Sequence, residues 1–121
     1  RIGEEDVTER QQRDAEFVVN AASRGMLLME ISQIALRKAS SPAVKTLAQT
    51  MLSQHSGLQQ DVKALAAQKS IVLPSGLGKD QGKQAGELTA LTGAAFDARY
   101  LEQVEKLHEQ SLNECDDMSE D

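Results

Sequence analysis

The stretch Ser40-Ser41-Pro42 decides the fold of this 121-residue chain, because it separates two long segments with helical periodicity. Ser41 is suited to cap a following helix, and Pro42 fits the first helical turn, where its fixed φ helps and its missing N–H would have no partner anyway. A turn of three residues makes the flanking helices antiparallel neighbours. The sequence therefore predicts a helical hairpin at this point.

The segments around this turn predict an all-α fold. Apolar residues recur at helical spacing over residues 14–38, 42–69 and 94–115, and residues 83–91 read as a short helix. Between them, residues 70–82 form a loop rich in Gly that contains Pro74. We predict an antiparallel helical bundle with three main helices plus a short connector helix, and strand content of no more than a few residues near Ile71–Leu73.

The chain divides into one domain and two polar ends. Residues 13–115 form the expected bundle domain, and residues 1–12 are polar and charged, so we expect them to be frayed or disordered. The acidic tail, residues 116–121, is expected to fray because negative charge near a helix C-terminus opposes the helix dipole.

Composition argues against several classes of function. The net charge of −6 disfavours a nucleic-acid partner, which requires a basic face, and aromatic residues make up only 2% of the chain. No run of about 18 apolar residues exists to span a membrane. The chain begins at Arg1 with no apolar leader (no signal peptide), so we expect a mature or trimmed product, and a single cysteine, Cys115, leaves the redox compartment open.

Both histidines fall on apolar helical stripes, which makes them the best candidates for a site. One stripe reads Val44, Ala48, Met51, His55, Leu58, Val62, Leu65, and the other reads Asp97, Leu101, Val104, His108, Ser111, Cys115, Met118. We expect both imidazoles to face the inside of the bundle and to be partly or fully buried. A buried imidazole must be hydrogen-bonded or bind a ligand, or else it costs stability.

Two roles for these histidines follow. In the structural role, which we expect, each ring is bonded to a backbone carbonyl or to a side chain such as Asp97 or Tyr100. In the alternative role, His55, His108, Met51 and Asp97 are metal ligands, since Met51 shares the face of His55 and a thioether with an imidazole suits copper.

A third candidate feature is a contact surface. The stretch Gly25-Met26-Leu27-Leu28-Met29 is apolar nearly all round, as in helices buried on more than one side. We therefore predict self-association as a homodimer through an interface that includes Met26, Leu28 and Met29.

Residues 14–109 resemble a bacterial protein family, the domain of unknown function 4142. The matching segments are Phe17-Val18-x-x-Ala21-Ala22, Gly25-Met26, Ala35-Leu36-x-Lys38-Ala39-Ser40-Ser41-Pro42-x-Val44-Lys45, Ala48-x-x-Met51-x-x-x-His55, Leu65-Ala66, Leu73-Pro74, Leu91-Thr92-Gly93, Phe96-Asp97-x-x-Tyr100 and Val104-x-x-x-His108. The resemblance implies a ferritin-like helical bundle and a periplasmic or envelope-associated location. It implies no established activity.

The chain also departs from the family pattern. Family members typically carry an acid where Leu28 stands and Asp where Gln54 and Leu107 stand, so both imidazoles remain while three nearby acids are absent. Ferritin-type metal sites take most of their ligands from carboxylates in Glu-x-x-His pairs. Glu105 and His108 have that spacing, but Leu52 stands three residues before His55.

The family pattern continues into a further long helix, whereas this chain ends at Asp121. We therefore expect a second copy or a partner protein to complete the bundle. The sequence favours a non-enzymatic envelope protein with no cofactor that acts through protein–protein contact or self-association. The alternative is a ferritin-like protein that binds copper, zinc or iron through inward-facing histidines.

Overall fold

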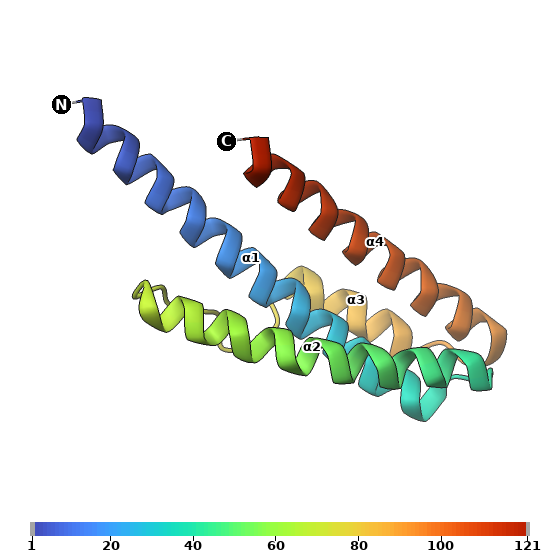
Figure 1. Cartoon of the computed structure of the whole chain (residues 1–121). Helices are drawn as coiled ribbons and strands as arrows, with labels where there is room; N and C mark the ends of the chain where they lie inside the picture. The colour runs from blue at the N-terminus through green and yellow to red at the C-terminus, as the bar shows by residue number, and fades with distance from the viewer. Residues whose placement is uncertain (1, 121) are drawn as a thin grey trace.

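The computed structural model describes the backbone of residues 2–120 and the side chains of residues 9–114, and over this range the chain is all-helical, without a strand. Four helices follow one another: α1 (Ile2–Lys38), α2 (Pro42–Gln68), α3 (Lys79–Thr89) and α4 (Gly93–Glu120) (Figure 1). The expected helix class and the short connector helix, α3, are confirmed.

Two helix boundaries correct the sequence-based expectation. Residues 1–12 were expected to be frayed or disordered and the tail to fray; the structure begins α1 at Ile2 and continues α4 to Glu120, and the expected fraying stays a prediction. Once a helix has nucleated, each further residue adds one hydrogen bond, so good helix formers extend it. The Glu, Arg and Gln residues before Asp14 act in this way. Residue 121 lies outside the described residues, as do the side chains of the tail.

The turn between α1 and α2 is held in a way that the sequence did not indicate. Pro42 opens α2 as predicted, but the Ser41 side chain makes no capping hydrogen bond. Instead, the carboxylate of Asp97 on α4 accepts the Ser40 N–H at 3.0 Å, the Ser41 N–H at 3.0 Å and the Ser40 hydroxyl at 2.7 Å. A negative charge therefore lies at the N-terminus of α2, where the helix dipole favours it.

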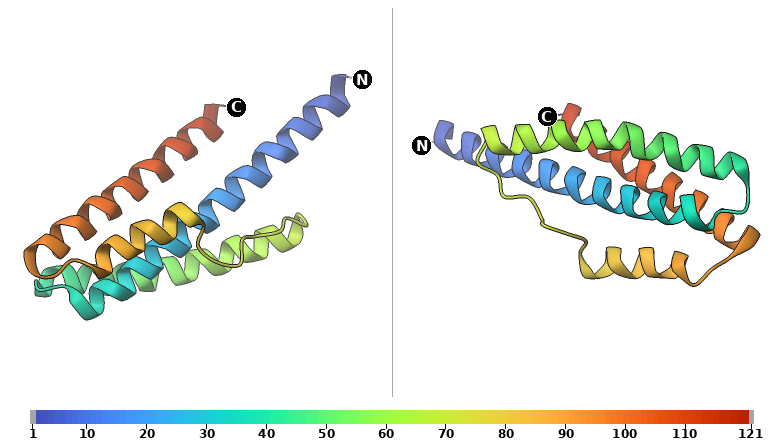
Figure 2. Two further views of the ribbon diagram at one scale, coloured as in Figure 1. Left: turned by 180° about the vertical axis from the view of Figure 1, so that it is seen from behind. Right: turned by 90° about the horizontal axis from the view of Figure 1, so that it is seen from below.

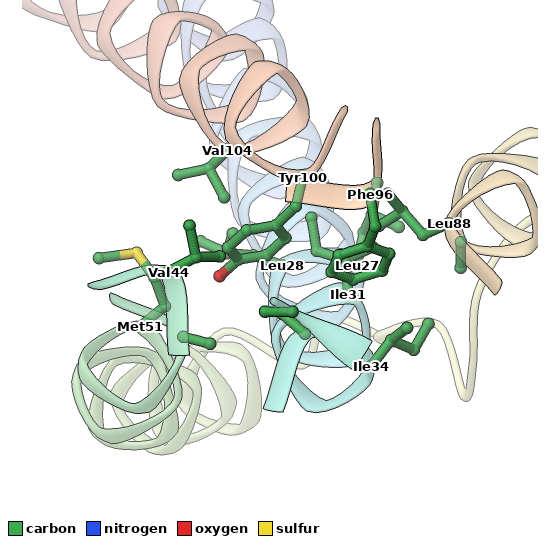
Figure 3. Packing of buried hydrophobic residues seen from close by; sticks show 14 of the residues in the cluster. Leu27, Leu28, Ile31, Ile34, Val44, Met51, Leu88, Phe96, Tyr100 and Val104 are labelled. Carbon is green, nitrogen blue, oxygen red and sulfur yellow. The ribbon is translucent and has the colours of Figure 1, made fainter. Parts of the chain in front are cut away.

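The hydrophobic core lies at the end of the molecule that holds this turn. Phe96 and Tyr100 of α4 and Ile31 of α1 are fully buried, and Leu88 of α3 closes the core on one side (Figure 3). The hydroxyls of Tyr100 and Ser32 are 2.7 Å apart, so these two buried hydroxyls are hydrogen-bonded to each other.

The other end of the molecule is open. Both chain ends lie there, and α1 and α4 extend away from α2 (Figures 1 and 2). This divergence positions the candidate site, because it leaves the facing sides of α1, α2 and α4 incompletely covered.

Candidate functional site: a groove with two facing histidines

A groove of about 290 Å³ runs between α1, α2 and α4, and we call it the histidine groove. Its lining residues are Phe17, Ala21, Arg24, Gly25, Leu28, His55, Leu58, Gln59, Val62, Leu107, His108 and Ser111. The lining is mostly apolar, with a few polar groups, which is the usual character of a binding site.

The floor of the groove depends on Gly25 in α1. The side chain of Gln59 in α2 lies across this glycine, and its Nε2 donates to the carbonyl of Ala22 at 3.2 Å. A Cβ at position 25 would come 2.3 Å from Oε1 of Gln59, so a side chain there would displace the amide. Gly25 therefore permits a direct polar link between α1 and α2 beneath the groove.

Arg24 connects α1 to the α4 wall. Its Nε donates to the Ser111 hydroxyl at 3.1 Å, and its Nη1 forms an ion pair with Glu114. The Arg24 guanidinium, which lines the groove, is thus charge-balanced within the chain. The rest of the groove surface is left to apolar side chains, the Gln59 amide and the two imidazoles.

The structure brings the two histidines together. The ring centres of His55 and His108 are 6.2 Å apart and their planes are inclined by only 18°. His55 is half-buried, as expected, but His108 is exposed, so the expected burial of both rings is wrong for His108. The cause is the divergence of α2 and α4, which leaves the end of the groove that contains His108 uncovered.

Neither side chain proposed as a hydrogen-bond partner serves these histidines. Asp97 binds the turn at Ser40 and Ser41, and Tyr100 pairs with Ser32 in the core. Burial and, secondly, the electrostatic effect of the neighbouring His108 lower the pKa of His55 from its ordinary value. His55 is therefore neutral at pH 7, with a free ring nitrogen lone pair.

The pH dependence of stability follows from this lowered pKa. Because the unfolded chain binds a proton at His55 more readily, we expect the free energy of unfolding to fall as pH drops below about 6.5. His55→Leu should remove this part of the slope in urea titrations at pH 8 to 5. His108→Leu should reduce it only in part, because burial remains the larger cause. An unchanged slope in His55→Leu would contradict this assignment.

Met51 and Asp97 do not join the histidines. Met51 is only 7% exposed and packs in the core cluster, and Asp97 holds the turn. The predicted four-residue metal set is therefore reduced to its two imidazoles. Among the side chains that the structure describes, no three His, Cys, Asp or Glu residues are placed to hold an ion together.

The predicted contact surface at Met26, Leu28 and Met29 has a different explanation. Leu28 is only 2% exposed within the single chain, where it packs in the core at the base of the histidine groove, so its place in an intermolecular interface stays a prediction. Met26 and Met29 are half-buried and line a separate hollow with Leu73 and Pro74 of the α2–α3 loop. Part of the surface predicted to meet a second chain therefore borders this loop of the same chain.

Leucines of the two predicted stripes are exposed, which the periodicity did not indicate, and Leu112, outside the stripes, is exposed too. Leu58 of α2 is 52% exposed and lines the groove, and Leu65 follows it at seven residues. On α4, Leu101 and Leu112 lie seven residues before and four residues after His108, hence on the same helix face. The heptad spacing of these positions was the available signal. These leucines extend the apolar walls beyond the groove itself.

The fold and the groove define a helical-bundle protein with an open, largely apolar groove between three of its four helices. The chain belongs to the family described as a domain of unknown function (DUF4142), whose family model matches residues 3–121. No curated protein and no solved structure matches the chain. Within the described residues, no helix is both long enough and apolar enough to cross a membrane.

Proposed function

We propose that this protein acts without catalysing a reaction, as a homodimer in which a second copy of the chain fills the histidine groove. The observation that carries the proposal is the row of exposed leucines on both walls. Of the large hydrophobic side chains exposed in the described part of the chain, Leu58 lines the groove, Leu65 lies on the same helix as Leu58, Leu101 and Leu112 lie on the helix of His108, and Val72 lies in the loop between α2 and α3.

The amount of exposed surface supports a second copy as the occupant. The chain exposes 7736 Å², whereas a globular monomer of its 13.1 kDa mass exposes about 6,400 Å². The difference is on the order of 1,300 Å², more than the roughly 800 Å² that each partner buries in a standard stable interface. The projecting ends of α1 and α4 contribute to this excess (Figure 1), and a symmetric dimer would bury the part at the groove through the same surface on both chains.

The chemistry of the lining supports a non-enzymatic role. Arg24 is bonded to Ser111 and Glu114, and Gln59 to a backbone carbonyl, so these polar groups serve the fold. Apolar walls favour a helix face as a ligand over a polar substrate. The resemblance of the chain to ferritin-like antiparallel bundles of the bacterial envelope supports a periplasmic or envelope-associated location.

Sedimentation equilibrium on the wild type and on a Leu58→Glu/Leu112→Glu double variant tests the dimer. We expect the wild type to be dimeric at tens of micromolar and the double variant to dissociate at least about 100-fold more readily, since a charge would be buried in an apolar contact. Added salt should strengthen the wild-type dimer, because each chain carries a net charge of −6.

Val72→Glu is the matched control. Val72 is 88% exposed and lies in the loop between α2 and α3, so a glutamate there should leave the dimer unchanged. All variants replace exposed side chains, and circular dichroism should show unchanged helix content. A wild type that is monomeric at tens of micromolar, or a Val72→Glu variant that dissociates as readily as the double variant, would overturn the proposal.

A further inference from the structure

We propose that His55 of α2 and His108 of α4 form a two-imidazole site for a transition-metal ion, with Cu²⁺ bound in preference to Ni²⁺ or Zn²⁺. The two rings face each other across the histidine groove, with their centres 6.2 Å apart. Both ligands come from one chain, so the site does not depend on the proposed dimer.

The separation of the rings fits a shared ion. With metal–nitrogen bonds of about 2.0–2.1 Å, two imidazoles on one ion have ring centres about 5 Å apart in tetrahedral geometry and about 6 Å apart when they lie opposite each other. The observed 6.2 Å is at the wide end of this range. The two planes are inclined by only 18°, and a nitrogen lone pair lies in the plane of its ring, so one ring must turn before both nitrogens point at the same ion. His108 is exposed, and rotation about its side-chain torsions can turn its nitrogen toward an ion held by His55.

The electrostatics of the groove are compatible with a bound cation. Besides the two histidines, the groove lining includes the Arg24 guanidinium, and its ion pair with Glu114 of α4 neutralises that charge. The pKa of His55 is lowered by burial, so this ring is in the neutral form that a metal requires. Asp97 and Tyr100, the two side chains expected as hydrogen-bond partners of this ring, bind other groups.

The ligand set selects the class of metal. Imidazole nitrogens suit copper, zinc and nickel, whereas Mg²⁺ and Ca²⁺ prefer oxygen ligands. With two protein ligands, water completes the coordination, and Glu105, one helical turn before His108, is the nearest acid along that helix face. Since α2 and α4 are opposite walls of the groove, a shared ion would fix their separation.

Titration calorimetry and pulsed electron paramagnetic resonance with Cu²⁺ test the site in untagged protein. We expect one equivalent per chain, two coordinated imidazoles in the spectrum, and a higher melting temperature with Cu²⁺ than with Mg²⁺. His55→Ala and His108→Ala should each weaken binding at least about tenfold and leave at most one coordinated imidazole.

Two further variants make the result specific. Cys115→Ser should retain Cu²⁺ binding, which would show that the thiol is not a ligand. Leu58→Glu/Leu112→Glu should retain Cu²⁺ binding too, which would show that the site does not require the dimer. Loss of Cu²⁺ binding in Cys115→Ser, or equal binding in wild type and in a His55→Ala/His108→Ala double variant, would overturn the proposal. So would the absence of coordinated imidazole in the wild type.

Discussion

The Asp97→Ala variant should melt on the order of 10 °C below the wild type in thermal denaturation followed by circular dichroism. Alanine removes the acceptor of three hydrogen bonds, two from the backbone of Ser40 and Ser41 and one from the Ser40 hydroxyl. It also removes a negative charge at the N-terminus of α2. Because Asp97 belongs to α4, the substitution removes the link between the α1–α2 turn and α4. It also weakens the N-terminus of α2.

Asp97→Asn and Glu102→Ala are the matched controls for this effect. Asparagine keeps the shape and one acceptor oxygen, so it should fall between wild type and alanine. Glu102 is also an acid on α4, but its ion pair with Arg99 is exposed, so its removal should shift the melting temperature by no more than about 2 °C. If Asp97→Ala behaved like Glu102→Ala, the turn would not be held from α4.

Acid should reproduce the effect of the Asp97 substitution. The hydrogen bond from the Ser40 hydroxyl lowers the pKa of Asp97, against the opposing effect of burial. The stabilisation is therefore complete above the ordinary aspartate pKa of about 3.9 and is lost as the pH falls below it. Asp97→Ala should lack this acid-dependent loss.

The same residue shows where sequence reasoning was sufficient and where it failed. Pro42 and the apolar periodicity on either side predicted the turn and the two helices, because those signals are local. Asp97 was an unexplained acid on an apolar stripe and was therefore grouped with the metal candidates. Its real partners, Ser40 and Ser41, lie 57 and 56 residues away in sequence, and only the packing of α4 against the turn reveals them.

The histidine groove has the same mixture of predictable and unpredictable parts. The stripes correctly placed His55 and His108 among apolar residues. Whether the two rings would meet depends on how α2 and α4 are aligned along the bundle, which the intervening loop and α3 determine. The exposure of His108 and the covering of Met26 and Met29 by the 70–78 loop depend on the same alignment. Periodicity gives the face of one helix and carries no information about what covers it.

The largest loss of stability is expected from Phe96→Ala, which should reduce the free energy of unfolding by about 3–5 kcal/mol. Phe96 is fully buried and lies among residues of α1 and α3 near Tyr100 (Figure 3). Truncation removes a ring from the part of the core where three helices meet, and the rigid helices around it cannot close the cavity. Since small domains have only about 5–15 kcal/mol in total, much of the stability would be lost.

Tyr100→Phe provides the comparison for the Phe96→Ala prediction, because it keeps the ring and removes only the hydroxyl that pairs with Ser32. Its cost should be about 1–3 kcal/mol, the penalty for leaving the Ser32 hydroxyl buried without a partner. Urea titrations of the wild type and the two variants would measure both losses. All three are measured at the same chain concentration, because the apparent stability of a dimer depends on concentration. A smaller loss of stability in Phe96→Ala than in Tyr100→Phe would contradict the prediction. The contact of α4 with α1 and α3 would then not be the centre of the core, and the open end of the molecule would contribute more to stability than expected from its exposed leucines.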